Sequence, residues 1–306
     1  MQELEAGGLT GVTVLRRGRN ARTGAREAQV TILVARRPPV SARPTLSPPA
    51  MVSEELVRRA VQREMAKVAL FPGRGPGWPA GGPHAVAAGY DADEVDRIPA
   101  AARESFCGVA NVVARAALQR GETVVDVGCG SGLDLVLAAS RVGEQGRVWG
   151  VEMTEEMLKR ASSALRHAGL TWARVHKGVA EELPLPAGEA DVAWSNGVLG
   201  AHVVDKLRAL REMARVLKPG GRLLLAELVR PTVAEQARRA VPGHWASDVV
   251  GAIPLSELVE LCRRAGFAVV RQHDVTNVLA GSRLEDKARA ASLHGVIIEA
   301  RREGGP

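Results

Sequence analysis

A glycine-rich stretch, "GETVVDVGCGSGLD" (121–134), constrains the fold of this chain more than any other feature of its sequence. The stretch contains a β-branched run, which is followed by Gly128, Gly130 and Gly132 at alternate positions. Glycines at the join between a buried strand and a helix let the backbone approach a ligand at the carboxyl ends of parallel strands. The stretch therefore predicts a nucleotide-binding turn, although spaced glycines by themselves also occur in ordinary turns.

The sequence around this turn alternates between strand-like and helix-like segments. The helical patterns lie at 133–142, 154–168 and 205–217. The strand-like runs are 123–128, 147–152, 173–177, 191–195, 222–229, 268–275 and 294–301. A short segment separates the last two runs, so we expect an antiparallel pair at one edge. The alternation predicts an α/β fold, a Rossmann-like, seven-stranded and mostly parallel sheet with helices on both faces.

The segment before this alternation, residues 51–119, predicts an N-terminal helical cap region. Its first part, "SEELVRRAVQREMAKVAL", has an apolar stripe at helical spacing, with Ser53 as the expected N-cap. The stripe consists of Leu56, Val57, Ala60, Val61, Met65 and Val68. A second helical stretch, about 92–118, is interrupted near Pro99 and again at Cys107-Gly108.

Residues 1–50 differ from the rest in composition. They are rich in arginine and proline and carry an excess of five positive charges, out of +7 for the whole chain. Such a composition is not expected to fold alone. We interpret the segment as a disordered extension, or as upstream sequence that precedes a true start at Met51. A transit peptide is a third interpretation, against which Glu3 and Glu5 count.

The composition of the body excludes several classes of partner. Its charge is nearly balanced and only 3% of the chain is aromatic, which argues against a nucleic-acid surface. No apolar run approaches the roughly 20 residues that cross a bilayer. The three cysteines, Cys107, Cys129 and Cys262, lack the spacing of a disulfide framework or a CxxC metal site. We therefore expect a cytoplasmic protein without metal that binds a small-molecule substrate; no partner protein is identified.

Two acidic residues indicate which nucleotide the turn would hold. Glu152 ends the next strand, where a carboxylate can accept hydrogen bonds from both ribose hydroxyls. Asp126 precedes Gly128 by two residues, and the glycine spacing is G-x-G-x-G rather than the dinucleotide pattern G-x-G-x-x-G. A carboxylate there repels a pyrophosphate but suits a ligand with an ammonium and a sulfonium, such as S-adenosylmethionine. The alternative is that Asp126 only stabilises the turn.

Four stretches over about 120–230 resemble the successive motifs of class I S-adenosylmethionine-dependent methyltransferases. They are "VVDVGCGSGLDLVLAA", "GVEMTEEMLKRA", "KGVAEELPLPAGEADVAWSN" and "LREMARVLKPGGRLLLAELV". More narrowly, "AGYDADEVDRIPAAARESFCGVANVVARAAL" and "EMTEEML" resemble the arsenite methyltransferase branch, over about 51–270. The resemblance implies S-adenosyl-L-methionine as cofactor and S-adenosyl-L-homocysteine as product. It also implies a methyltransferase domain over 120–306 with a lid insertion after the fifth strand, at about 230–254.

The same resemblance implies a set of cofactor-binding residues. They are Asp126, Gly128, Cys129, Gly130, Gly132, Asp134, Glu152, Met153, Ala180, Glu181 and Asn196. In this assignment the glycine turn lines the methionine part and Glu152 holds the ribose. Met153, Ala180 and Glu181 contact the adenine, and Asn196 lies near the methyl group. The alternatives are that Met153 only fills the core and that Glu181 is a solvated loop acid.

The acceptor side departs from the family pattern. Arsenite methyltransferases bind arsenic(III) through three cysteine thiolates, which are soft ligands. Cys107 matches the first of them, but Gly197 and Asp248 stand at the other two positions. One thiolate cannot form a three-sulfur site, so we predict that this chain does not methylate arsenite efficiently.

A small organic acceptor is the resulting hypothesis, methylated by in-line displacement. The candidate catalytic residues are His202 and Asp248, which would accept or orient a proton. Cys107, Gly197 and Trp245 are the candidate substrate pocket. Two alternatives stay open: a paralogue that binds the cofactor without catalysis, and residual arsenite methylation. Each acceptor-side residue can also be read as a lid or core residue without chemistry.

Overall fold

The structure is a computed structural model that describes residues 12–14, 33–35, 53–72, 79–231, 251–275, 278–282 and 284–304. The chain divides into two compact units, Met1–Pro49 and Ala50–Pro306. In the first unit, β1 (Val12–Val14) and β2 (Leu33–Ala35) pair antiparallel. Most of the expected lid insertion falls on 232–250 and so lies outside the described residues.

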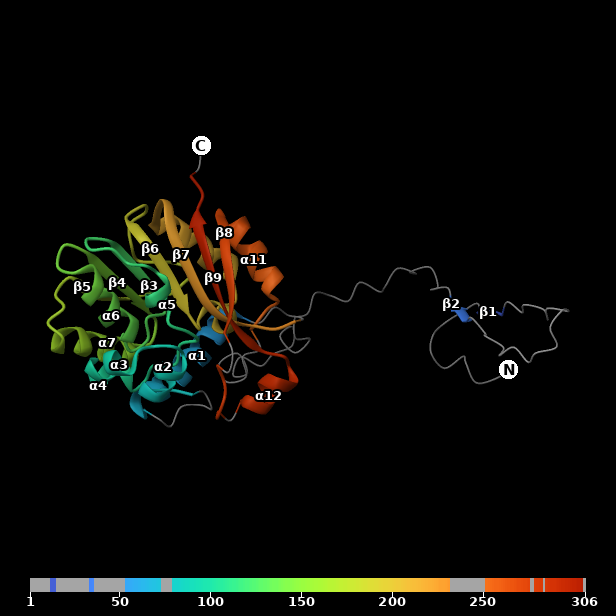
Figure 1. The fold of residues 1–306 in the computed structure, drawn as a ribbon, viewed down its shortest axis with the longest axis horizontal. Helices are drawn as coiled ribbons and strands as arrows, with labels where there is room; N and C mark the ends of the chain where they lie inside the picture. The colour runs from blue at the N-terminus through green and yellow to red at the C-terminus, as the bar shows by residue number, and fades with distance from the viewer. Residues whose placement is uncertain are drawn as a thin grey trace, which may run out of the picture. The chain divides into compact units, whose positions relative to one another are not determined.

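Seven strands form a single sheet in the second unit (Figure 1). They are β3 (Thr123–Val127), β4 (Arg147–Glu152), β5 (Ala173–Lys177), β6 (Ala190–Asn196), β7 (Leu217–Val229), β8 (Phe267–Val275) and β9 (His294–Arg302). Their order is β5-β4-β3-β6-β7-β9-β8, with parallel pairing from β5 to β7 and antiparallel pairing on both sides of β9. The predicted mostly parallel sheet and its antiparallel edge pair are confirmed.

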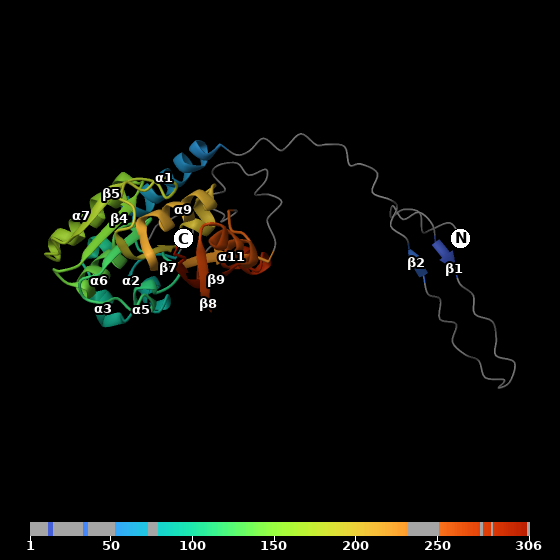
Figure 2. The same cartoon turned by 90° about the horizontal axis from the view of Figure 1, so that it is seen from above.

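Helices cover both faces of this sheet, because neighbouring side chains of a strand point to opposite faces. In β3, Val124 packs in the core under α6 (Leu133–Val142) and α7 (Glu155–His167). Val125 packs in the opposite core, under α9 (Lys206–Val216) and α11 (Leu255–Arg264). Figure 2 shows α6 and α7 apart from α9 and α11, seen from above. The prediction of a sheet covered on two faces is confirmed.

Shorter helices complete the second unit. They are α2 (Gly82–Ala87), α3 (Ala92–Arg97), α4 (Ala100–Arg103), α5 (Val112–Arg115), α8 (Leu199–His202) and α12 (Glu285–Ala290). The helical stretch expected over 92–118 is interrupted at Pro99, which precedes α4, and at Cys107-Gly108, which lies between α4 and α5. Within the described part of the chain, no helix has the length and apolarity needed to cross a membrane.

The N-terminal helix α1 (Glu54–Leu70) packs on the second unit through the predicted stripe, with one exception. Val57, Val61 and Val68 are buried, and they pack near Met153 and Met157. Leu56, by contrast, is 52% exposed, so its place in the stripe was wrong. It lies one residue, about 100° of helical turn, away from Val57 at the centre of the buried face. Ser53 occupies the N-cap position, but its side chain makes no capping hydrogen bond.

Candidate functional site

A cavity lies at the carboxyl ends of β3, β4 and β6, between the glycine turn and helix α1. It contains about 1080 Å³ of empty space, counted to its open mouth. The predicted residues that line it are Cys107, Gly128, Gly130, Glu152, Met153, Ala180, Glu181, Asn196, Gly197 and His202. The structure therefore brings residues from five separate segments of the sequence to one wall, at the end of the sheet where ligands bind in open α/β folds.

Not all the predicted residues reach this wall. Asp126, Cys129, Gly132 and Asp134 do not line the cavity. Gly132 instead lies where α6 meets α7: a Cβ on it would be 3.0 Å from Cβ of Ala161. The other predicted acceptor-side residues, Asp248 and Trp245, lie outside the described residues.

The glycine turn is tight because its backbone adopts conformations that side chains disfavour. Gly128 has φ +77° and Gly130 has φ +52°, both in the left-handed region. A Cβ on Gly128 would be 2.4 Å from Cγ2 of Val198, whereas a Cβ on Gly130 would meet no atom within 4 Å. Gly128 thus permits a close backbone approach, and Gly130 presents bare backbone to the cavity.

Glu152 ties this turn to the end of β4. Its Oε2 accepts a hydrogen bond from the Gly130 N–H at 3.1 Å, and its Oε1 accepts one from the Thr154 N–H at 2.7 Å. Burial raises the pKa of the Glu152 carboxyl, although these hydrogen bonds oppose the rise. A carboxylate offers about four acceptor positions, so Glu152, which lines the cavity, can still accept hydrogen bonds from a diol.

Two more carboxyl groups are buried behind the turn. Asp126 is only 2% exposed, and its Oδ2 accepts no hydrogen bond from the described residues. Burial, and then the negative charge of Asp134, raise the pKa of Asp126 well above its ordinary value. Burial likewise raises the pKa of Asp134, to about 6. Together with Glu152 these groups surround the turn with buried carboxyls, whose ionisation a positively charged ligand would favour.

Asp134 belongs to a polar cluster that also contains Tyr90 and Asn196. The Tyr90 hydroxyl donates to Asp134 Oδ1 at 2.6 Å, and Asn196 Nδ2 donates to Asp134 Oδ2 at 3.0 Å. Asn196 Oδ1 accepts from the Val109 N–H at 2.7 Å. Asn196 therefore holds the segment after Cys107 against the end of β6. Sequence reasoning missed Tyr90, and the available signal was that the chain contains only one tyrosine.

The far end of the cavity is formed by residues after β4 and β5, and by α1. Met153 packs beside Val57 and Val61 of α1. Glu181 is 7% exposed, and its Oε1 lies 3.5 Å from Nη2 of Arg58, which also lines the cavity. Sequence reasoning assigned α1 to a cap and did not place Arg58 in the site. Its position next to Val57, at the edge of the apolar stripe, was the available signal.

The three cysteines are free thiols in different surroundings. Cys107 is the one that lines the cavity, and burial raises its pKa to about 11. Cys129 lies against β4, since a Cβ on Gly150 would be 2.7 Å from its Sγ. Cys262 is buried in α11, and burial raises its pKa to about 12. Thiolate ligation would require Cys107 to lose its proton against this burial cost, without a second described cysteine in the wall.

A buried glutamate, which was not predicted from the sequence, stabilises the part of the cavity wall that contains Gly197 and His202. Glu227, at 0% exposure, accepts hydrogen bonds from Ser195 Oγ at 2.7 Å and from the N–H groups of Leu199 and Gly200 at 3.1 and 2.8 Å. Burial raises its pKa. These three bonds fix the backbone that leads into α8, and so fix the place where His202 lines the cavity.

Comparisons with known proteins agree with this architecture. A family model described as a methyltransferase domain matches residues 118–279, more than half of the chain. An arsenite methyltransferase from Halobacterium salinarum is 34% identical over 60% of this chain and 46% of its own length. A demethylmenaquinone methyltransferase from Listeria welshimeri is 30% identical over 50% of this chain and 73% of its own length.

The fold is also shared with a crystal structure of an arsenic(III) S-adenosylmethionine methyltransferase from Chlamydomonas reinhardtii. That structure has a TM-score of 0.52 and 24% sequence identity, covering 74% of this chain and 75% of its own. The present chain spans about half the length of the Halobacterium relative. The matched domain, the sheet order and the glycine turn lead to one assignment. The chain belongs to the methyltransferase-domain family, has the fold of class I S-adenosylmethionine-dependent methyltransferases, and is related to arsenite methyltransferases.

Proposed function

We propose that this chain transfers a methyl group from S-adenosyl-L-methionine to a small organic acceptor by in-line displacement, leaving S-adenosyl-L-homocysteine. The observation that carries the proposal is the glycine turn with Glu152 in the cavity wall and Asp126 and Asp134 buried behind it. Bare backbone, a diol acceptor and buried carboxyls that a cation would help to ionise suit an adenosyl group joined to a cationic amino acid. The three free thiols fit a reducing compartment, so we place the activity in the cytoplasm.

The described residues would contact three parts of this cofactor: its amino-acid part, its ribose and its adenine. The backbone at Gly128 and Gly130 would lie along the amino-acid part, and Glu152 would accept hydrogen bonds from the ribose hydroxyls. Met153 would pack on the adenine ring, whose edge would meet the Ala180 N–H and the Glu181 carboxylate. When bound, S-adenosylmethionine supplies a methyl group already activated by its sulfonium.

The protein would contribute alignment and exclusion of water to the transfer. Apolar side chains from α1 and from the segment after β6 line the cavity: Val57, Val61, Met65, Val198, Val203 and Val204. Holding two reactants in line within such a site is worth up to roughly 7–11 kcal/mol of barrier. No catalytic triad is required, because the leaving group needs no further activation.

The acceptor would enter beside Cys107, Gly197 and His202, which line the same cavity. We propose that His202 orients the acceptor or takes the proton that it loses. Asp248 as a second base and Trp245 as a pocket residue stay predictions from the sequence. The relatives do not define the acceptor, since one is named for arsenite and another for demethylmenaquinone.

Two other functions have specific support. Cys107 in the wall and the Halobacterium relative favour residual arsenite methylation. The raised pKa of its thiol and the glycine at position 197 argue that such activity is weak. A cofactor-binding paralogue without catalysis is favoured by the retained turn beside the altered acceptor side.

The decisive experiment has two stages. Calorimetry of the full chain with S-adenosylhomocysteine should show binding, and absence of binding would refute the proposed function. Methyl-labelled S-adenosylmethionine is then incubated with the protein and separately with arsenite, a quinol, a phenol panel and a native small-molecule extract. Label in an organic product supports the proposal. Label in arsenic alone supports the arsenite alternative, and binding without transfer supports the non-catalytic paralogue.

A further inference from the structure

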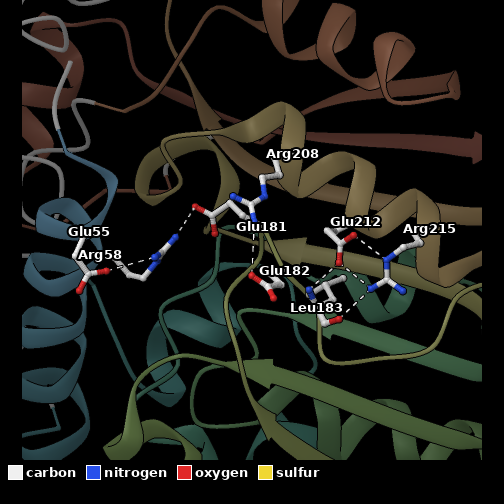
Figure 3. A network of polar contacts seen from close by, with 8 residues as sticks. All are labelled: Glu55, Arg58, Glu181, Glu182, Leu183, Arg208, Glu212 and Arg215. Atoms are coloured by element: carbon white, nitrogen blue, oxygen red, sulfur yellow. Dashed lines mark hydrogen bonds and ion pairs between the residues drawn. The ribbon is translucent and has the colours of Figure 1, made fainter. Parts of the chain in front are cut away.

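One ion pair links helix α1 to the loop that follows β5. Nη2 of Arg58 lies 3.5 Å from Oε1 of Glu181 (Figure 3). Both residues line the cavity. The Glu181 side chain is 8% exposed and that of Arg58 is 25% exposed, so the pair is largely shielded from water. An ion pair in such surroundings constrains geometry more than one on the open surface.

The guanidinium of Arg58 is itself oriented by α1. Its Nη1 lies 3.5 Å from Oε2 of Glu55, one turn earlier on the same helix. Figure 3 shows Arg58 extending from α1 between Glu55 and Glu181. The neighbouring Arg59 pairs with Glu55 at 2.7 Å but does not line the cavity.

The backbone after Glu181 is held from the opposite side by α9. Glu212 Oε2 accepts a hydrogen bond from the Leu183 N–H at 2.8 Å. Arg215 donates to the Leu183 carbonyl at 2.9 Å and to Glu212 at 2.7 Å. With the backbone fixed two residues away, the ion pair with Arg58 orients the Glu181 carboxylate, on which the buried Lys206 ammonium also acts electrostatically.

We propose that Arg58 is a positioning residue that makes the base selectivity of the site depend on α1. This inference rests on the proposed binding of an adenosyl cofactor. Arg58 holds Oε1 of Glu181, so that Oε2 would serve a ligand in the cavity as a pure hydrogen-bond acceptor. A 6-aminopurine can donate to that oxygen. A 6-oxopurine presents a second acceptor there, so it leaves both groups unpaired in a buried site.

The test compares the affinities of S-adenosylhomocysteine and S-inosylhomocysteine for the full chain by calorimetry. Wild type should prefer the adenosyl ligand. Arg58→Gln should reduce that preference by about tenfold, the value of one hydrogen bond to a charged group. Arg58→Lys, which keeps the positive charge, should retain more of the preference than Arg58→Gln does. Arg59→Gln, which removes the same charge from the adjacent position, should leave it unchanged. The ratio of two affinities does not depend on the fraction of protein that is folded.

Three results would overturn the proposal. Equal preference in wild type and Arg58→Gln would mean that Arg58 does not orient Glu181. Tighter binding of both ligands by Arg58→Gln would mean that the guanidinium occupies the base position. A further loss when Arg58→Gln is added to Glu181→Gln would mean that Arg58 acts through another group. If wild type binds neither ligand, the proposed function fails as well, a result distinct from these three.

Discussion

The hydroxyl group of Tyr90 lies 2.6 Å from Oδ1 of Asp134, although the two residues are 44 positions apart in the sequence. Tyr90 comes from the helical region before the sheet, and Asp134 lies in the first turn of α6, directly after the glycine turn. The hydrogen bond therefore joins the N-terminal region to the turn that we propose holds the cofactor. Because both groups are buried, neither can exchange this partner for water.

Tyr90→Phe should lower both stability and cofactor affinity. The variant removes the hydroxyl and leaves a buried carboxyl oxygen with one partner fewer, which costs about 1–3 kcal/mol in the free energy of unfolding. Urea denaturation measures the first effect and calorimetry with S-adenosylhomocysteine the second. An unchanged free energy of unfolding would contradict the hydrogen bond. Phe106 packs edge-on against Tyr90 at 5.1 Å between ring centroids, so the remaining phenyl ring keeps its contact.

Cofactor affinity should fall as the solution becomes acidic, while the ligand-free protein is stabilised by the same protonation. The folded-state pKa of Asp134 is about 6, above its ordinary value of 3.8. Between these values the folded chain binds a proton more readily than the unfolded chain, so this group adds stability as pH falls from about 6 toward 3.8. Protonation also removes a negative charge that would favour binding of an ammonium group. Calorimetry across this pH range should show weaker cofactor binding at lower pH. Urea denaturation of the ligand-free protein should show a larger free energy of unfolding at lower pH.

Asp134→Asn provides the control for this pH dependence. It retains an oxygen acceptor for Tyr90 but cannot titrate, so the affinity profile should become flatter. Asp126, whose pKa is also raised, would account for the dependence that remains. A profile that is identical in wild type and Asp134→Asn would rule out Asp134 as the titrating group.

Gly128→Ala should abolish cofactor binding and destabilise the fold. The new Cβ would be 2.4 Å from Cγ2 of Val198, at a φ of +77° that alanine disfavours. Backbone strain of this kind costs about 1–3 kcal/mol, to which the clash adds. Adding Val198→Ala to Gly128→Ala should recover only the part of the destabilisation that comes from the clash. Gly130→Ala, whose Cβ meets no atom within 4 Å, should be milder in denaturant titrations. Equal losses at both glycines would contradict the steric argument.

Glu227→Gln should destabilise the wall that carries His202. The amide replaces one carboxyl oxygen with a donor, which would face a backbone N–H in either orientation, that of Leu199 or that of Gly200. Loss of a buried bond of this kind costs roughly 1–3 kcal/mol in the free energy of unfolding. Glu260→Gln removes an exposed acid on α11, and its effect should stay within about 0.5 kcal/mol. Denaturation curves that coincide for the two variants would refute the role of Glu227.

The sheet and the turn could be predicted because their signals are local. The apolar runs around Asp126 and Trp194, and the glycines at 128 and 130, encode strand and turn within a few residues. β7 begins at Leu217 rather than at residue 222, because Leu217 pairs with Ala190 across a register shift that no local pattern indicates. The assignment of Leu56 to the packed stripe was wrong for a similar reason, because helical spacing indicates a stripe but not where its edge lies.

The sequence by itself determined the class of fold, the glycine turn with its acids, and the loss of two of three expected cysteines. Only the tertiary structure decided that Asp126 lies behind the cavity wall, that Tyr90 binds Asp134, and that Arg58 meets Glu181. The physical reason is the range of the interactions. Backbone conformation and side-chain periodicity act between neighbours along the chain. Ion pairs and buried hydrogen bonds depend on the final approach of segments that folding brings together from distant positions.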